Sequence, residues 1–406
     1  MSMRSLHLFG IICSVFVSVM CAAPVQAQKI LGQFEKPLPA ITPLPESEFL
    51  AKTALMEAVP VGDKTLQYEM RYLKGWTVDK AVNMGGSNNE KKIMQETSVL
   101  NGPYNENGSK SWIEVKTGAL DYNMTAQEWL IRHMLENGYG VLGTKFYNNK
   151  KAEALYIYVK NSETYNVRTV VILNGNNLLL VSYWVPAAYW EDEKSMQAQV
   201  IKSVTLKAER AIYKEKVLTF DFLDIAELSY PYAWSLKPMS ETSVVRMKVA
   251  LFNYGIILEN NQRKLDGRVD IEMSATINTK SYEEAWGQYK LDSQTNGMAL
   301  GDIIEKPDDF ILNPNFDFAQ TEVYSATNVI DKLIDYEFWV TAVSFKEYYF
   351  FVSLLTPSRD YDYFAWSKNR EHYRSIINGL NSQKKPFEDL MKAHEKSGEG
   401  GAPAIP

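Results

Sequence analysis

The sequence predicts an α+β protein built from two similar domains, each an antiparallel sheet flanked by helices. Two observations support this prediction: short patterns recur along the chain, and the same order of strand and helix signals surrounds each recurrence. The recurring patterns are Tyr72-x-x-x-Trp76 as Tyr230-x-x-x-Trp234 and Ile113-Glu114-Val115 as Ile271-Glu272-Met273, both 158 positions later, and Val181-Ser182-x-x-x-Pro186 as Val352-Ser353-x-x-x-Pro357, 171 positions later. A tandem duplication is the simplest explanation of these repeats.

The N-terminus predicts an exported protein. Residues 1–27 have a basic start at Arg4, an apolar run over 6–20, and small residues before the expected cleavage point. Because the run is shorter than the roughly 20 apolar residues that cross a bilayer, we expect a signal peptide cleaved near Ala27 and a periplasmic mature protein. A lipoprotein attached through Cys21 is the alternative, but Met20 is bulkier than the small residue usual before such a cysteine.

The composition argues against several classes of function. Both cysteines, Cys13 and Cys21, lie in the leader, so the mature chain has no thiol for a disulfide or a zinc site. The chain carries 43 basic and 49 acidic residues without a basic cluster, which argues against nucleic acid as a partner. Aromatic residues make up 12% of the chain, enough for aromatic-lined cores or binding faces.

The chain divides into five predicted parts. After the signal peptide, residues 28–60 form a proline-rich tether followed by a short helix over 47–58. Residues 61–210 form the first α+β repeat, and residues 211–382 form the second. Residues 383–406 end in a Gly/Ala/Pro stretch and are predicted to be a flexible tail.

The first repeat reads as a meander of strands with a capped helix. Runs rich in Val, Ile, Leu and Tyr predict strands over 66–72, 112–116, 154–160, 167–173 and 178–185. Asn174-Gly175-Asn176-Asn177 predicts a tight hairpin between the last two. Thr125 and Glu128 form a capping box that opens a helix, and Glu128, Arg132 and Glu136 follow at i,i+4 spacing on its expected wet face.

The second repeat follows the same order, and each repeat closes on a helix. Strands of the second repeat are predicted over 244–252, 269–276, 337–345 and 348–355. Ser281 and Glu284 repeat the capping box. The first closing helix follows Pro186 and has acidic residues in its first turn, and the second has apolar residues at 373, 376, 377 and 380.

This order of elements resembles the PsbP/Mog1-like fold. In the second copy the opening strand leads into Ser229-Tyr230-Pro231-Tyr232-Ala233-Trp234, and the closing helices end in Val200-Ile201-Lys202-Ser203-Val204 and Ile376-Ile377-Asn378-Gly379-Leu380. That superfamily includes photosystem extrinsic subunits, a nuclear Ran-binding protein and bacterial envelope lipoproteins. The resemblance therefore implies a binding or assembly module without shared catalytic residues.

The sequence presents no convincing catalytic or metal-binding constellation. Gly138-Tyr-Gly140-Val-Leu-Gly143 has the spacing of a dinucleotide fingerprint, but a helix precedes it and a strand follows, so we interpret Gly138 as a helix C-cap. The three histidines of the mature chain are scattered and have no cysteine beside them, which argues against zinc. Ser182 could meet His133 in space, but it lacks the glycine-flanked elbow of a nucleophile. We expect no cofactor and no metal.

Aromatic residues are the remaining signal. They cluster around Pro186 and after Pro357, and neighbours such as Tyr183 and Trp184 point to opposite faces of a strand. Either helices cover both rings, or one ring of each pair belongs to a contact patch repeated on both copies. The candidate binding residues are Trp184, Tyr189, Trp190, Tyr361, Tyr363 and Trp366.

These observations favour a non-catalytic binding or assembly protein of the bacterial cell envelope. Its expected partner is another envelope protein or complex, with the membrane surface as a peripheral contact. Two alternatives stay open. One is an envelope hydrolase that acts in a cleft between the domains, and the other is a periplasmic protein that binds a small molecule or lipid in an aromatic-lined pocket.

Overall fold

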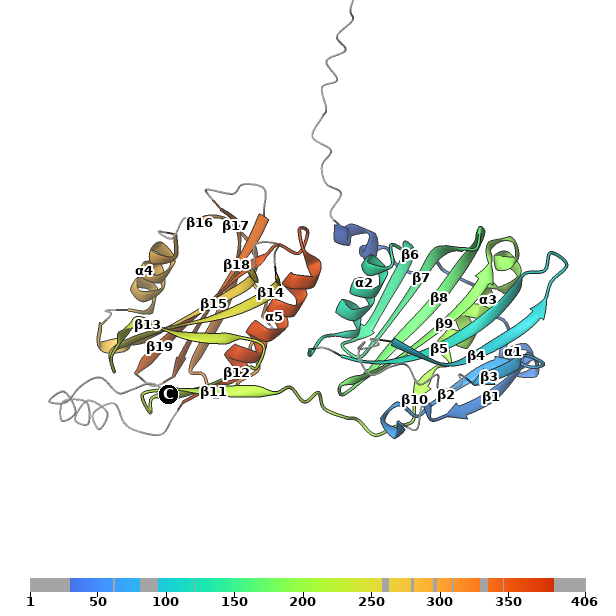
Figure 1. Cartoon of the computed structure of the whole chain (residues 1–406), viewed down its shortest axis with the longest axis horizontal. Coiled ribbons are helices and arrows are strands. Elements are labelled where there is room, and N and C mark those ends of the chain that lie inside the picture. Colours follow the sequence, from blue (N-terminus) through green and yellow to red (C-terminus); the bar gives the residue numbers. More distant parts are fainter. Residues whose placement is uncertain are drawn as a thin grey trace, which may run out of the picture.

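The computed structural model describes residues 30–60, 63–80, 94–120, 122–257, 263–278, 281–294, 298–308, 310–328, 335–345 and 347–382. These residues form two seven-stranded antiparallel sheets, one for each sequence copy, with helices on their faces (Figure 1). The predicted α+β fold with two similar domains is confirmed.

The first sheet has the strand order β3-β4-β5-β9-β8-β7-β6. Its strands are β3 (Thr77–Lys80), β4 (Met94–Tyr104), β5 (Lys110–Ala119), β6 (Gly140–Asn148), β7 (Lys151–Lys160), β8 (Glu163–Asn174) and β9 (Asn177–Pro186). β8 and β9 form the predicted hairpin, in which Asn174 pairs with Asn177 and Gly175 has a φ of 61°. Glycine adopts this left-handed conformation without a steric penalty, so the turn closes tightly.

The second sheet repeats this order as β13-β14-β15-β19-β18-β17-β16. Its strands are β13 (Ser235–Thr242), β14 (Arg246–Ile257), β15 (Arg263–Ala275), β16 (Met298–Glu305), β17 (Phe318–Asn328), β18 (Asp335–Phe345) and β19 (Tyr348–Pro357). In both sheets the third strand pairs with the last strand along the chain, at the centre of the sheet. The same topology in both halves is what a tandem duplication predicts.

A three-stranded sheet accompanies each large one. The first has the order β1-β2-β10 and the second β11-β12-β20, with strands β1 (Thr53–Ala58), β2 (Tyr68–Leu73), β10 (Thr205–Leu206), β11 (Val217–Phe222), β12 (Ala226–Pro231) and β20 (Leu380–Ser382). The helix predicted over 47–58 is therefore wrong in its second half, because α1 (Glu46–Lys52) ends where β1 begins. Pairing of all six residues of β1 with β2 outweighs a weak helical periodicity.

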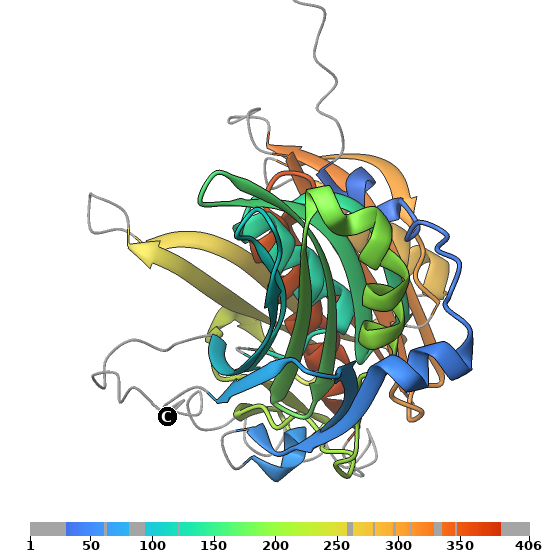
Figure 2. The same ribbon diagram turned by 90° about the vertical axis from the view of Figure 1, so that its right-hand side faces the viewer.

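Each large sheet has a helix on each face. α2 (Ala126–Glu136) and α4 (Tyr282–Gln294) follow the third strand of their copy, and α3 (Trp190–Lys202) and α5 (Tyr363–Asn378) follow the last. Alternate residues of β9 separate the two layers: Val181 packs with the α3 residue Val200, whereas Leu180 lies in the cluster that contains the α2 residue Leu130. Figure 2 shows α3 packed against one face of the first sheet.

The strand register aligns the two copies residue by residue. Ser182 lies opposite Glu114, and Ser353 lies opposite Asp270. Glu114 therefore corresponds to Asp270 by register, whereas the repeated Ile-Glu pattern aligns it with Glu272. Two residues of slippage keep every side chain on the same face of a strand, so apolar alternation alone cannot distinguish the two alignments.

Part of the predicted tether contacts the first sheet. η1 (Ile30–Glu35) packs against β6, and Pro37 forms a parallel bridge with Thr144. Leu38 N donates to Thr144 O at 3.1 Å, and Thr144 N donates to Lys36 O at 2.8 Å. The predicted signal peptide and flexible tail lie outside the described residues. No helix in the described part of the chain is long and apolar enough to span a membrane.

The two copies meet where α2 faces α5 (Figure 1). Arg370 Nη1 donates to Glu128 Oε1 at 2.8 Å, and the Arg132 guanidinium lies over the Phe364 ring. Glu128 is only 6% exposed, so the predicted wet face is wrong for this residue, because α5 of the second copy covers it. The ion pair between Arg132 and Glu136, 2.9 Å long, stays near the surface as predicted.

The tryptophan that ends the recurring Tyr-x-x-x-Trp pattern contacts α5 of its own copy, and through His372 it is linked to the residues just before β11. Trp234 is 2% exposed, and its Nε1 donates to His372 Nδ1 at 2.8 Å. Since indole N–H is only a donor, His372 Nδ1 must accept, and the ring proton sits on Nε2. That nitrogen lies 3.2 Å from Glu215 Oε1, just before β11. His372 is thus a structural residue of the α5 packing.

Candidate binding site under helix α2

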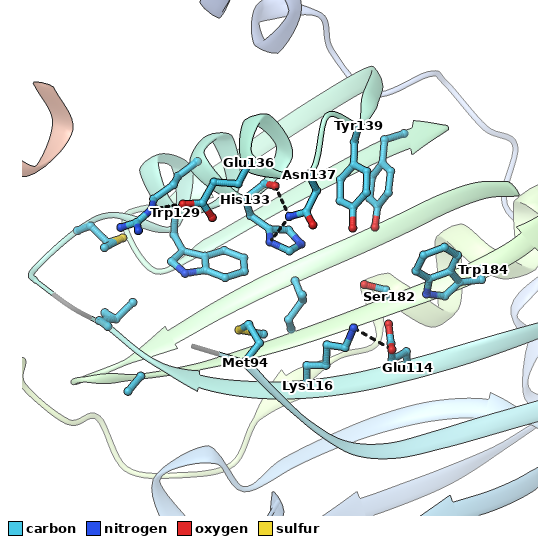
Figure 3. A pocket seen from close by; sticks show the side chains of 16 residues that line it. Met94, Glu114, Lys116, Trp129, His133, Glu136, Asn137, Tyr139, Ser182 and Trp184 are labelled. Atoms are coloured by element: carbon cyan, nitrogen blue, oxygen red, sulfur yellow. Dashed lines mark hydrogen bonds and ion pairs between the residues drawn. The ribbon is translucent and has the colours of Figure 1, made fainter. Parts of the chain in front are cut away.

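A cavity of about 280 Å³ lies between α2 and the first sheet, and we call it the α2 recess (Figure 3). Its lining combines aromatic rings, aliphatic side chains and charged groups. The residues that carry the following argument are Glu114, Lys116, Trp129, His133, Tyr139 and Trp184. Figure 3 shows Trp129 and His133 projecting from the helix side, and Glu114, Lys116 and Ser182 lying on the sheet side.

Both ends of α2 are fixed by local sequence signals. Thr125 Oγ1 accepts from Glu128 N at 3.1 Å and Thr125 N donates to Glu128 Oε2 at 2.8 Å, so the capping box is confirmed. Gly138 follows the helix with a φ of 63°, which confirms its interpretation as a C-cap glycine. These ends set the rotation of α2 so that Trp129 and His133, one turn apart, both border the recess.

His133 is a neutral ring in the recess. Its ring stacks on that of Trp129 with centroids 4.8 Å apart and lies edge-on to Tyr139 at 5.7 Å. Burial, helped by the charge of Lys116, lowers the pKa of His133 to about 4, although Glu114 acts in the opposite direction. The imidazole is therefore uncharged at neutral pH and offers one donor and one acceptor.

The charged groups of the recess balance one another. Lys116 Nζ lies 2.8 Å from Glu114 Oε1, and both residues point from β5 toward the recess. On the helix side, Arg132 pairs with Glu136. The recess thus presents two cations and two anions, each with a partner, and no net charge.

The indole N–H of Trp184 is a hydrogen-bond donor without an acceptor in the described part of the chain. Its side chain is 7% exposed, and its ring stacks on that of Trp112 with centroids 5.0 Å apart. Its Nε1 is buried and has no acceptor among the residues that the structure describes. A buried polar group without a partner costs about 1–3 kcal/mol. This group therefore favours a ligand that brings an acceptor atom into the recess.

In the second copy, side chains fill the space between α4 and the large sheet that corresponds to the α2 recess. Tyr289 and His133 lie equally far from the capping residue that opens their helix, and Tyr289 Oη donates to Ser353 Oγ at 2.9 Å. The rings of Tyr289 and Phe351 stack at 4.9 Å, with both side chains buried. Phe351 precedes the paired serine by two residues, as Leu180 does in the first copy.

Three of the matched positions that differ carry this contrast between the two copies. Around the α2 recess they are His133, Leu180 and Trp184, and in the second copy they are Tyr289, Phe351 and Leu355. Leu355 has no polar atom in its side chain, so the second copy needs no acceptor where the first copy places an indole N–H.

The recess does not set a nucleophile against a base. Ser182 Oγ lies 2.6 Å from Thr169 Oγ1, and His133 Nδ1 lies 3.3 Å from the side-chain nitrogen of Asn137. In the described ranges, no three His, Cys, Asp or Glu side chains gather at a metal-binding spacing. Ring faces, ion pairs and an unused donor are instead the features of a site that binds.

In the first copy, the predicted aromatic patch is divided between two places. Trp184 lines the α2 recess, whereas Tyr189 and Trp190 are half-buried where α3 begins. Trp190 Nε1 donates to Gln197 Oε1 at 3.1 Å, and Tyr189 Oη accepts from Asn107 Nδ2 at 2.9 Å. Trp184 is therefore the predicted residue that borders the recess.

In the second copy, the predicted patch residues differ in exposure. Tyr361 is 49% exposed, whereas Tyr363 and Trp366 are buried at the start of α5. Trp366 Nε1 donates to Glu337 Oε2 at 2.8 Å. A role of the six aromatic residues in partner contact stays a prediction.

Glu114, Lys116 and Trp129 were not predicted as site residues. Glu114 and Lys116 alternate with buried residues in a run that becomes a central strand, so both must face the layer under a helix. Charged residues at such positions need partners there, and this alternation is the signal that could have indicated the recess.

No protein-family model and no curated protein matches the chain. Among solved structures, the chain is similar to the PsbP protein CyanoP of Synechocystis (13% identity, 42% of this chain and 98% of that chain, TM-score 0.28). It is also similar to the Ran-binding protein Mog1p of Saccharomyces cerevisiae (10% identity, 44% and 99%, TM-score 0.30). A third is LpqN, involved in cell envelope biogenesis of Mycobacterium tuberculosis (13% identity, 41% and 98%, TM-score 0.22). Each of these three structures matches less than half of this chain.

Proposed function

We propose that this protein is an exported, non-catalytic binding protein of the bacterial cell envelope, and that it holds its partner protein at the α2 recess. The observation that carries the proposal is the contrast between the two copies. The first leaves a cavity with an unused buried donor at Trp184, whereas the second fills the matched place with Tyr289 and Phe351.

The envelope part of the proposal rests on the sequence. Residues 1–27 have the three regions of a signal peptide, and the mature chain after Ala27 contains no cysteine. A protein without thiols folds in an oxidising compartment without disulfide errors. Together with the fold, these features support a periplasmic module that binds another envelope protein.

The test is to close the recess with the side chains that the second copy already uses. His133→Tyr with Leu180→Phe places the Tyr289 and Phe351 residue types at the matched positions, so the substitution suits the fold. Affinity purification of the tagged protein from an envelope fraction, followed by mass spectrometry, should recover a partner with the wild type. The double variant should lose that partner while keeping the circular dichroism spectrum of the wild type.

The matched control is Tyr289→Phe, which removes the hydrogen bond to Ser353 in the second copy and leaves the recess untouched. This control should recover the partner at the wild-type level. A partner that is recovered equally well by the filled double variant contradicts a binding role of the α2 recess.

A further inference from the structure

We propose that the α2 recess receives the phenol ring of a tyrosine from the partner protein, with Trp184 Nε1 donating to the phenol oxygen and Glu114 accepting from the phenol O–H. This inference rests on the proposed function and names the chemical group that the site recognises. It follows from four features: the unused donor, the matched residue of the second copy, the charge balance and the size of the cavity.

The first feature is the buried N–H of Trp184, which needs a hydrogen-bond acceptor. Trp184 Nε1 is buried, borders the recess, and has no acceptor among the described residues. Figure 3 shows Trp184 beside Ser182 and Glu114, on the sheet side of the recess. An indole N–H can only donate, so the ligand must bring an acceptor to this point.

The second feature is the tyrosine ring that the second copy places between α4 and its sheet, at the position that matches His133. Tyr289 reaches from α4 toward the sheet, its ring stacks on Phe351, and its hydroxyl donates to Ser353. Ser353 is the counterpart of Ser182. The fold therefore accommodates a tyrosyl ring between helix and sheet. In the first copy Tyr156 reaches Ser182 instead, and the smaller ring of His133 stands at the position that matches Tyr289, with the recess beside it.

The third feature is charge. The four charged lining residues form two ion pairs, so a ligand with a net charge would have to compete with one of these pairs, and a neutral polar group suits the recess. A phenol hydroxyl is neutral and both accepts and donates. A carboxylate offers about four lone-pair sites, so Glu114 can accept a hydrogen bond from the phenol hydroxyl while keeping its contact with Lys116.

The fourth feature is size and surface. A cavity of about 280 Å³ lies at the lower edge of the range for small-ligand pockets, so it has room for a single ring. Trp129, His133 and Tyr139 present ring faces and edges on the helix side. Tyrosine is also among the residues that most often anchor protein interfaces.

The experiment uses the full mature chain and two small probes, 4-methylphenol and toluene, which differ by one hydroxyl. Isothermal titration should show 4-methylphenol binding about a hundredfold more tightly than toluene, the value of two added hydrogen bonds. Trp184→Phe keeps a ring and removes the N–H, and it should lower this preference to about tenfold, the value of the contact with Glu114 alone. Trp190→Phe, which removes an N–H outside the recess, should leave the full preference.

Equal affinity for the two probes, or a preference that is as large in Trp184→Phe as in the wild type, would overturn the phenol inference. The source of the phenol is tested by competition: saturating 4-methylphenol should release the captured partner, and toluene should release it only at about a hundredfold higher free concentration. If 4-methylphenol binds through Trp184 but leaves the partner in place, the phenol does not come from that partner. Loss of the partner on filling the recess, without phenol binding, would sustain the proposed function and reject only its ligand.

Discussion

Beneath α2 the first copy keeps a cavity bordered by His133 and Trp184, whereas beneath α4 the second copy stacks Tyr289 on Phe351. The strand order, the capped helix and the central serine are shared, so the difference comes from a few side chains. A duplicated fold can thus use one copy as a packed support and free the matched place in the other for binding.

The first way to test this contrast is to truncate one matched side chain in each copy. Phe351→Ala should lower the free energy of unfolding by about 4 kcal/mol, because it creates a cavity in a filled core. Leu180→Ala should cost only about 2 kcal/mol, because Leu180 already borders open space and loses fewer contacts. Urea unfolding of the full mature chain measures both values. Equal losses would show that the two places are packed alike.

A second test compares the capping glutamates of α2 and α4. Glu128→Ala should cost about 3 kcal/mol, because it removes a buried partner of Arg370 as well as the helix cap. The matched change Glu284→Ala, at an exposed position, should cost about 0.5 kcal/mol. Similar costs in thermal unfolding would mean that α5 does not hold α2 through this ion pair.

A third test uses pH. The pKa of His133 falls from its ordinary 6.5 to about 4 in the folded protein, so between these values the unfolded chain binds a proton that the native chain does not. Stability should therefore be fully kept above pH 6.5 and fall as the pH drops toward 4. We expect His133 to contribute about 2 kcal/mol to this fall, after allowance for its partial exposure.

The control for the pH test is His133→Tyr, which gives the first copy the residue type of the second and removes the titrating ring. In the variant, the difference in the free energy of unfolding between pH 7 and pH 4 should be smaller by about 2 kcal/mol than in the wild type. An unchanged difference would show that His133 titrates near its ordinary pKa and does not lie in a buried site.

Local signals predicted much of this architecture. Thr125 and Glu128 identified the start of α2, Gly138 its end, and Asn174 to Asn177 the hairpin, because each depends on backbone geometry within a few residues. The duplication itself was visible because paired patterns recur at nearly constant offsets. Such features need no knowledge of the tertiary contacts.

The parts that sequence reasoning missed depend on contacts between distant residues. Glu128 was expected in solvent, but its partner Arg370 lies 242 positions away in the other copy. The α2 recess likewise depends on the register of β5 against β9, and the repeated Ile-Glu pattern aligns β5 with β15 two residues away from the alignment that the register gives. Alternation with a period of two shows which face of the sheet each side chain points to, but it does not determine which residues of two paired strands lie opposite each other.

The most direct measurement is the affinity of the captured partner for the wild type and for the His133→Tyr, Leu180→Phe double variant, each immobilised at equal density. If the α2 recess is the binding site, filling it should weaken binding at least about a hundredfold, since a buried anchor is worth about 3 kcal/mol. Tyr289→Phe should bind as the wild type does. Equal affinities for the wild type and the filled variant would contradict the division between a binding copy and a support copy.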